Sequence, residues 1–335
     1  MTNFESRIER WTRAFEISAG ESGSGDAVRV TDLYNSIYSR RVDARHYAWR
    51  YFPAHGRACV LLAQKENMLA GAYGYRINRV ASPGGDISAA LGTDMMVGEP
   101  FRATGLVFAR LNLEAERAAR ADGASLFYLF PNQRGAAAWL ASEGWSLVRM
   151  LRTFDRSTAI EPYEGDIGFH RIDRFGAWVD PLTDRFRSLY VALALVRRDA
   201  EYLNWRFVDN PTYDYDMFDV RVDGESAGYL VLKIFRDAVS GNAFGDIVDL
   251  IWTRDDPALL EAMLRYALGH FAAQSVRSAS IWLETNTLLD SVGSALGFRA
   301  GGMERAFCCR AFDKQGERLL EPEGWYLTLS DSEIY

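Results

Sequence analysis

The sequence predicts an α/β (α+β) protein of two similar domains in tandem, each with a mixed central sheet flanked by helices. Three observations support this prediction. The chain has 335 residues, more than one compact core usually serves at about 150 residues per domain. Short apolar runs typical of strands alternate with amphipathic stretches typical of helices. Markers in the first half also recur in the second half, as internal repeats do.

The repeat is marked by three pairs of motifs that keep nearly one spacing. They are Trp49-Arg50 and Trp205-Arg206, 156 positions apart, Asp94 and Asp249, 155 apart, and Gly144-Trp145 and Gly297-Phe298, 153 apart. Chance rarely keeps three spacings so close, so we expect both copies to share one fold. Pro162 and Gly165 lie in a stretch of little apolar periodicity, which predicts a linker over 158–167.

The elements of the first copy follow from apolar periodicity and from turn residues. A helix over 4–18 and a Gly/Ser hinge over 20–25 form a leading segment, 1–26, before the first domain, 27–157. Amphipathic spacing predicts helices, and β-branched or continuously apolar runs predict strands. The predicted order is helices 32–39 and 44–52, strands 58–64, 69–78 and 88–97, helix 106–121, strand 125–130, helix 135–142 and strand 147–154.

The second domain, 168–335, repeats this order. The same criteria predict helices 184–194 and 199–207, strands 217–222, 227–235 and 246–252, helix 257–273, strand 280–284, helix 288–296 and strand 306–312.

The bulk composition excludes several classes of function. The net charge of −7 and the pI near 5.3 argue against nucleic acid as a partner, which requires clustered Lys and Arg. No apolar run approaches the roughly 20 residues of a membrane span, and residues 1–5 lack the apolar core of a signal peptide, so we expect a cytoplasmic protein. Cys59, Cys308 and Cys309 are interpreted as buried strand residues, and the four histidines form no metal-binding pattern, so we expect no metal.

The stretch 93–107 contains the most informative pattern. An apolar strand leads into a short turn with Arg102 and Gly105, and a helix begins at once. Such a turn directs unpaired backbone N–H groups at one point, where the positive end of the helix dipole adds to them. The pattern predicts a pyrophosphate site. Alternatively, Gly105 is only the starting glycine of a helix in an α/β turn.

This stretch resembles the acyl-CoA-binding motif of the GNAT superfamily of N-acetyltransferases. The loop of that motif reads Gln or Arg, two residues, Gly, one residue, then Gly or Ala. Arg102, Gly105 and Val107 occupy those positions here, and Val107 departs from the small residue expected. Asn132, followed by Gly144-Trp145, resembles the next motif of the family. The resemblance covers nearly the whole chain.

The resemblance implies a site for acetyl-CoA or another acyl-CoA as co-substrate. Its residues would be Met95, Met96, Val97, Arg102, Ala103, Thr104, Gly105, Leu106, Val107 and Asn132. A backbone N–H from 95–97 would stabilise the oxyanion. In the second copy the corresponding turn has no glycine, and its carboxylates Asp255 and Asp256 would repel phosphate. We therefore expect no CoA site in the second domain, which would complete a cleft or shape the acceptor pocket.

Candidates for proton transfer are fewer. Asp94, beside the expected thioester, is a candidate base, although Asp249 at the equivalent place in the second copy favours a structural role. Glu99 is a second candidate. The acid of the family is a Tyr near the end of the helix after Asn132, a position that Trp139 or Leu140 would occupy here. Tyr128 or Tyr73 would then be the proton donor, or the thiolate leaves through water.

Aromatic residues suggest where an acceptor would bind. Tyr47, Trp49, Tyr73 and Trp205 are candidates for substrate contact, since aromatic rings near a cleft stack on sugars or bases. The alternative for Trp at helical spacing with Tyr and Phe is a place in the core. His46 is a further candidate base.

The leading hypothesis is an acyl-CoA-dependent N-acyltransferase acting on a primary amine, such as an amino sugar or another small metabolite. A non-catalytic acyl-CoA-binding or sensing protein is the alternative, consistent with the missing Tyr. A tRNA-dependent aminoacyl transferase is the third hypothesis, against which the acidic composition counts. The oligomeric state is not indicated.

Overall fold

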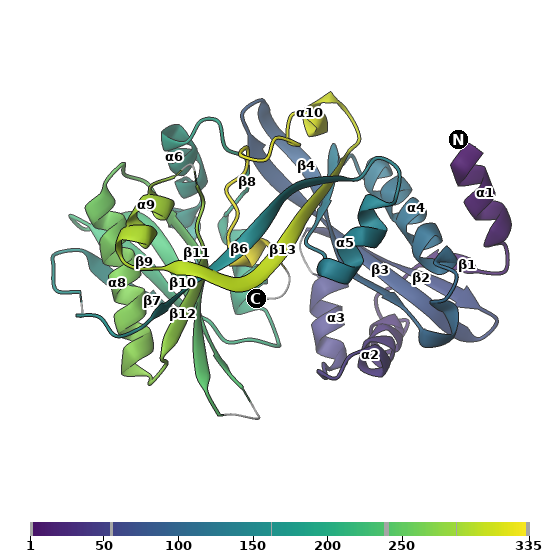
Figure 1. The fold of residues 1–335 in the computed structure, drawn as a ribbon, viewed down its shortest axis with the longest axis horizontal. Coiled ribbons are helices and arrows are strands. Elements are labelled where there is room, and N and C mark those ends of the chain that lie inside the picture. The colour runs from purple at the N-terminus through teal and green to yellow at the C-terminus, as the bar shows by residue number, and fades with distance from the viewer. Residues whose placement is uncertain (1–2, 54–55, 162, 238–240, 286, 333–335) are drawn as a thin grey trace.

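The computed structural model describes residues 3–53, 56–161, 163–237, 241–285 and 287–332. Two halves, each a sheet with helices packed on it, lie side by side, and two long strands cross between them (Figure 1).

The first half runs from α1 to β6. Its elements are α1 (Asn3–Trp11), β1 (Glu16–Ala19), α2 (Asp26–Ile37), α3 (Ala44–Tyr51), β2 (Arg57–Lys65), β3 (Met68–Ser82), β4 (Gly85–Val97), the 3-10 turn η1 (Glu99–Phe101), α4 (Leu106–Ala121), β5 (Leu126–Leu129), α5 (Gln133–Leu140) and β6 (Ser146–Ser157). The prediction of one helix over 4–18 is wrong in its second part, because Ile17 pairs with Ala63 and β1 becomes an edge strand beside β2.

The second half begins at β7. Its elements are β7 (Gly168–Ile172), η2 (Ala177–Val179), α6 (Leu182–Leu189), β8 (Leu195–Val196), α7 (Ala200–Leu203), the π-helical turn η3 (Asn204–Val208), β9 (Asp216–Val222), β10 (Glu225–Arg236), β11 (Ala243–Trp252), α8 (Pro257–Ala273), β12 (Ser278–Trp282), α9 (Leu288–Ala295), β13 (Arg299–Ala311), α10 (Lys314–Glu317) and η4 (Leu329–Asp331). The predicted helix 184–194 ends early, at Leu189, because Ala194 is extended and forms a β-bridge with Trp325 just before β8.

The halves exchange their last strands. The sheet runs in the order β1-β2-β3-β4-β5-β13-β6-β12-β11-β10-β9-β7. β6 therefore pairs with β12 of the second half, and β13 returns to pair with β5 of the first half. The two exchanged strands also pair with each other at the centre of the molecule, where Figure 1 shows them crossing. Each half thus completes its sheet with a strand from the other.

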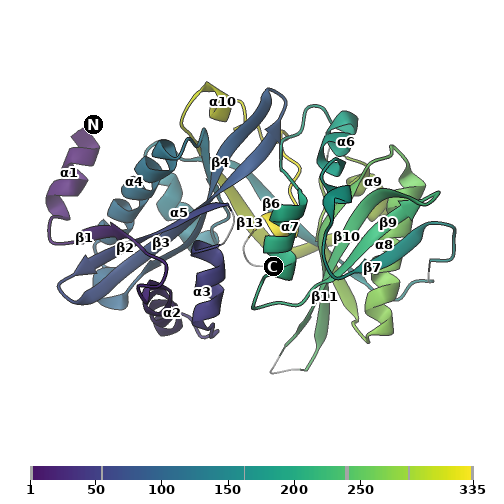
Figure 2. The ribbon, with the colours of Figure 1, turned by 180° about the vertical axis from the view of Figure 1, so that it is seen from behind.

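The repeated Trp-Arg motifs meet between the halves, where α3 and the α7–η3 segment lie next to each other (Figure 2). The rings of Trp49 and Trp205 stack with centroids 5.0 Å apart. Nε1 of Trp49 donates to the carbonyl oxygen of Trp205 at 2.7 Å, and Nε1 of Trp205 donates to that of Trp49 at 3.3 Å. This reciprocal contact is the local sign of a pseudo-twofold relation between the copies.

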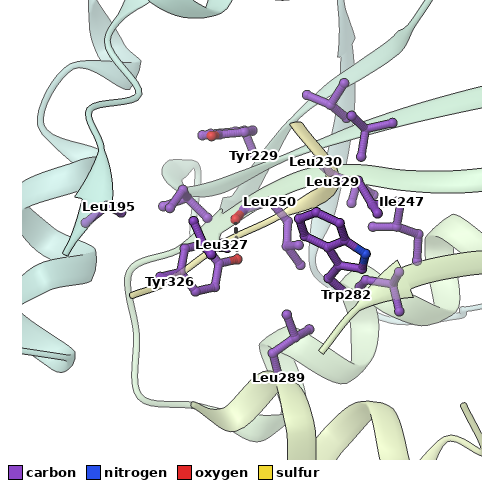
Figure 3. Packing of buried hydrophobic residues seen from close by; sticks show 14 of the residues in the cluster. Leu195, Tyr229, Leu230, Ile247, Leu250, Trp282, Leu289, Tyr326, Leu327 and Leu329 are labelled. Atoms are coloured by element: carbon purple, nitrogen blue, oxygen red, sulfur yellow. Dashed lines mark hydrogen bonds between the residues drawn. The ribbon is translucent and has the colours of Figure 1, made fainter. Parts of the chain in front are cut away.

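The largest core cluster fills the second half and continues into the first. It includes Val80, Ile87 and Tyr128 of the first half together with most of the buried side chains of β9–β12 and α8. Figure 3 shows Tyr326 and Leu327 packed beside Leu250 in this cluster. The Tyr326 hydroxyl donates to the carbonyl oxygen of Leu250 at 2.8 Å, so the C-terminal segment is part of the core.

Candidate functional site

A cavity opens where β4 and β5 separate. The two strands pair in parallel only over Ala89–Leu91 and Leu126–Tyr128, and from Gly92 onward β4 pairs with β3 alone. The space that results has a volume of about 790 Å³. We call it the β4–β5 cavity. Its walls come from α2, the segment 38–42, α3, β3, β4, the ends of β5 and α5, and from Tyr213 and Arg305 of the later part of the chain.

A bulge in β4 shapes the wall of this cavity. Thr93 pairs with Gly74 and Met96 pairs with Ala72, so Asp94 and Met95 together stand opposite Tyr73. Asp94 has φ 48°, a left-handed backbone that Asp tolerates better than most residues. The bulge brings two consecutive residues of one strand to the cavity wall.

The loop after β4 ends at the start of α4, as the sequence predicts. Gly105 caps the helix with φ 66°, and nothing lies within 4 Å of the position of an added Cβ. Arg102 lines the cavity, and its Nε donates to the carbonyl oxygen of Val97 at 2.8 Å. The residues 103–105 are exposed. Because the first N–H groups of a helix have no partner within the helix, this end of the cavity is electropositive.

Val107 does not crowd that loop. Its side chain is 1% exposed, and its Cγ1 would lie 2.9 Å from a Cβ added at Gly71 of β3. The residue larger than the family pattern expects is therefore accommodated inside the core, where a glycine on β3 makes room for it.

Asp94 lies in the cavity wall as half of an ion pair. Its Oδ2 accepts hydrogen bonds from Nη1 of Arg50 and from the hydroxyl of Tyr51, the latter at 3.0 Å. The Tyr51 hydroxyl is also 3.0 Å from Oγ1 of Thr93. The Arg50 guanidinium comes from the repeated Trp-Arg motif on α3, so that motif holds the carboxylate in place.

Two of the other predicted proton-transfer residues lie away from the cavity. Tyr128 of β5 is completely buried, and its hydroxyl accepts a hydrogen bond from Nδ2 of Asn78 at 2.7 Å. Burial raises its pKa well above the usual value. Glu99 is exposed in η1 and lies in a separate groove with Asp32 and Pro100. The structure does not bring either residue to the bulge.

The predicted aromatic contacts divide between cavity and core. Tyr73 lines the cavity, but Tyr47 is completely buried and stacks on Tyr51 at 5.6 Å. Trp49 and Trp205 contact each other between the halves. Of these four candidates, the structure places only Tyr73 in the wall of the β4–β5 cavity.

The Asn132 segment forms the opposite wall. Oδ1 of Asn132 accepts from the N–H of Gly135 at 2.7 Å and so caps α5. Trp139 of that helix lines the cavity 5.4 Å from the ring of Tyr73, whereas Leu140 is 39% exposed. Of the two residues that the resemblance suggests for the acid position, only Trp139 lines the cavity, and an indole N–H donates hydrogen bonds but does not give up its proton at neutral pH.

His46 lines the cavity and was a candidate from the sequence, but several other lining residues were not predicted. Tyr34, Tyr38 and Arg40 come from the end of α2 and the segment after it, and Tyr213 comes from the second half. Nη1 of Arg40 donates to the Tyr213 hydroxyl, and its guanidinium lies 4.7 Å from that ring. In the sequence, only the repeat could have drawn attention to this region, because Leu33-Tyr34 corresponds to Leu189-Tyr190 and Asp43 to Asp199.

His46 is held by the second half. Its Nδ1 lies 2.7 Å from Oγ1 of Thr212, and the ring is 7% exposed. Burial, and then the charge of Arg50, lower the pKa of His46 to about 3. The imidazole is therefore neutral at pH 7, and protonating it would place a second buried cation beside Arg50.

Comparisons with known proteins identify the fold. No family model and no curated protein matches the chain. A GCN5-related N-acetyltransferase from Anabaena variabilis matches with a TM-score of 0.64 and 11% identity, over 89% of this chain and 73% of that one. N-myristoyltransferase from Saccharomyces cerevisiae, solved with bound myristoyl-CoA, matches with a TM-score of 0.62 and 11% identity, over 89% and 79%. A probable N-acyltransferase from Enterococcus faecalis gives a TM-score of 0.60 and 12% identity, over 90% and 74%.

The chain has the GNAT fold.

In the second half of this GNAT-fold chain, the gap that corresponds to the cavity is filled. β11 and β12 pair in parallel only up to Asp246 and Ser280, and the C-terminal segment bridges the strands beyond that point. Oγ1 of Thr328 donates to Oδ1 of Asp249 at 2.8 Å. The guanidinium of Arg198 lies between Asp249, at 3.3 Å, and Asp331, at 2.7 Å, and all three are buried. At this place the second half therefore has side chains of the C-terminal segment where the first half has the cavity.

Glu284 also binds the C-terminal segment, through a hydrogen bond to its backbone. Its Oε1 accepts from Nη2 of Arg149 at 2.6 Å and from the N–H of Leu327 at 3.1 Å. Burial outweighs the charge of Arg149 and raises the pKa of Glu284 to about 7.

This pKa predicts a fall in stability with rising pH. A carboxyl whose folded-state pKa is raised binds its proton more tightly in the folded state, so its stabilisation is present below pH 4.5 and is lost as pH rises through 7. Between pH 4.5 and 8 the loss should reach about 3 kcal/mol at 1.36 kcal/mol per pKa unit. Urea unfolding of wild type and Glu284→Gln at several pH values measures this loss. Parallel pH profiles for the two proteins would contradict the assignment.

The three cysteines lie in strands, as the sequence predicts. Cys308 and Cys309 of β13 are also buried as expected, but Cys59 of β2 is only half-buried, so the prediction of burial is wrong for that residue. Across the described ranges, His, Cys, Asp and Glu side chains nowhere gather in threes that could hold a metal ion. None of the described helices combines the length and apolar character needed to cross a bilayer.

Proposed function

We propose that this chain is an acyl-CoA-dependent N-acyltransferase whose reaction takes place in the β4–β5 cavity. The observation that carries the proposal is that one cavity is lined by two kinds of group. Arg102 and Phe108 come from the loop before α4 and from its first turn, and Asp94, His46 and Tyr34 are the polar side chains that an acceptor would meet. A phosphate-binding loop next to polar groups for an acceptor is what acyl transfer from CoA requires.

The N–H groups of 103–107 would hold the pyrophosphate, with Arg102 beside them. The pantetheine arm would follow β4 to the bulge at Asp94 and Met95. The choice of an acyl-CoA as the ligand is supported by the solved N-myristoyltransferase, a protein of similar fold whose structure holds bound myristoyl-CoA.

In the reaction, the neutral amine attacks the thioester carbonyl carbon and forms a tetrahedral oxyanion. A backbone N–H from 95–97 stabilises the oxyanion. The nitrogen then loses a proton to water, the C–S bond breaks and the acyl group stays on nitrogen as an amide. The thiolate of CoA takes its proton from water, because Trp139 stands where a Tyr acid would be. The alternative proton donor to the thiolate is Tyr73, since of the two tyrosines predicted for this role only Tyr73 lines the cavity.

A variant pair tests the CoA end. Gly105 and Gly123 flank the same helix, both have positive φ, and both face open space. The two Gly→Trp variants therefore suffer similar backbone strain. Only Gly105→Trp places an indole in front of the helix N-terminus, so it should weaken acetyl-CoA binding by about 100-fold or more. Calorimetry measures both affinities, and equal effects of the two variants would reject this site.

Trp139 favours a second candidate function, that of a protein that binds acyl-CoA without turnover. Release of free CoA thiol in the presence of a panel of primary amines separates the two. Amine-dependent release establishes the transferase. Tight acetyl-CoA binding without release for any amine supports the sensor, and absence of binding at millimolar acetyl-CoA removes both.

A further inference from the structure

The two oxygens of Asp94 have different surroundings. Arg50 and Tyr51 both donate to Oδ2. Among the described residues, no donor contacts Oδ1. The Asp94 side chain is 18% exposed and lines the β4–β5 cavity. Oδ1 is therefore an acceptor in the wall that a ligand can reach.

The second copy shows what this position binds when it is filled. Asp249 also receives two donors at Oδ2, the Tyr229 hydroxyl at 2.8 Å and Nε of Arg198 at 3.3 Å. In addition, its Oδ1 accepts from the Thr328 hydroxyl at 2.8 Å. That third donor comes from the C-terminal segment lying in the gap. In the first copy the gap is open, so a bound molecule can supply the matching donor to Asp94.

The wall of the same cavity also contains the positively charged side chain of Arg40. The exposed guanidinium of Arg40 contacts the hydroxyl and the ring of Tyr213. In the part of the chain that the structure describes, no carboxylate lies within 4 Å of it. Arg50 and Asp94 neutralise each other, so Arg40 gives this end of the cavity a net positive charge.

Asp94 and Arg40 lie close to one stretch of wall. Burial raises the pKa of Tyr34, the negative charge of Asp94 raises it further, and the positive charge of Arg40 lowers it. The same two charges act on His46, after burial and Arg50. Tyr34 and His46 both line the cavity, so one small molecule can reach Asp94 and Arg40 together.

We propose that the acceptor is a primary amine that also carries an anionic group, with its ammonium bound at Oδ1 of Asp94 and its anion at Arg40. This inference rests on the proposed function. The acceptor binds as an ammonium, loses one proton to water and attacks as the neutral amine. The anion is a carboxylate or a phosphate, since a guanidinium binds either.

Matched pairs of amines, with and without the anionic group, distinguish a carboxylate from a phosphate. The pairs are β-alanine and propylamine for the carboxylate, and phosphoethanolamine and ethanolamine for the phosphate. Calorimetry on protein saturated with CoA measures binding without turnover. We expect the anionic member of at least one pair to bind about 10-fold more tightly or better. The pair with the larger ratio identifies the anion.

Variants assign the preference to residues. Arg40→Gln should abolish the difference within the pair. The adjacent Arg41→Gln should keep it, because Arg41 donates to the carbonyl oxygen of Asn35 and does not line the cavity. Asp94→Asn should weaken both members, and Asn also tolerates the left-handed backbone at this position. Unfolding curves verify that each variant folds.

The outcomes separate this inference from the proposed function. Equal binding of both members of each pair, or the same loss in Arg41→Gln as in Arg40→Gln, overturns the inference. Preferential binding that depends on Arg40, without acyl transfer to either amine, supports the inference and contradicts the transferase. If transfer occurs, kcat/KM should show the same preference, carried by KM.

Discussion

Replacing Arg198 with methionine should lower the free energy of unfolding by about 3–5 kcal/mol. The guanidinium is fully buried between the carboxylates of Asp249 and Asp331. Methionine keeps much of the packing but leaves two buried carboxylates without a cation, which is far more costly than losing an exposed ion pair. Urea unfolding at pH 7.5 measures the difference.

The pH dependence identifies the cause. Burial raises the pKa of Asp249, and Arg198 opposes that rise. Without the arginine, the folded-state pKa rises further, so the loss of stability should shrink as pH falls and the carboxyl is protonated. The control is Arg174→Met, since Arg174 is 58% exposed and pairs with Asp209 at 3.3 Å. Its effect should stay within about 0.5 kcal/mol. A pH-independent loss in Arg198→Met would point to packing instead.

Trp325→Ala should cost about 3–5 kcal/mol, the range for removing a large buried aromatic side chain. Trp325 is 0% exposed, and its Nε1 donates to the carbonyl oxygen of Leu319 at 2.8 Å. Its ring packs on Tyr128 of β5 and Phe307 of β13. The substitution therefore removes a contact that joins the C-terminal segment to the exchanged strand β13 and to its neighbour β5.

Thermal unfolding of Trp325→Ala and Trp11→Ala provides the comparison, because Trp11 is 52% exposed. The exposed tryptophan should change stability by no more than about 0.5 kcal/mol. Equal shifts in melting temperature for the two variants would contradict the packing role of Trp325.

The order of the elements could be predicted from the sequence because it depends on local patterns. The helix at 106–121 and the glycine that starts it are where the apolar spacing puts them. The repeat also correctly made Asp94 and Asp249 equivalent in their strands. What differs between them is the partner, Arg50 in one copy and Arg198 in the other.

The exchange of β6 and β13 could not be predicted in the same way. Each strand follows its own half in sequence, and its apolar pattern fits an interior place in either sheet. The choice of neighbour depends on contacts between residues far apart in the chain, such as Cys309 with Tyr128. A single sequence carries no local signal for such a pairing.

The acceptor side of the site was mostly missed for a related reason. Aromatic residues at helical spacing in α3 suggested ligand contact, yet Tyr47 packs in the core and Trp49 packs against its own repeat. The residues that do line the cavity, such as Arg40 and Tyr213, come from irregular segments and from opposite halves. Their meeting depends on how the halves dock, which spacing along the chain does not encode.

The exchange of strands also limits the order in which the molecule can be made. β5 has β13 as its neighbour, and β13 ends at Ala311. A ribosome that has finished the first half has therefore not yet made the strand that covers one edge of β5. That edge stays exposed, as a template for wrong pairing, until β13 has been made and has emerged from the ribosome. Completion of the β4–β5 cavity, to which Arg305 of β13 contributes, therefore has to wait for the synthesis of a strand that comes more than 150 residues after β5 in the chain.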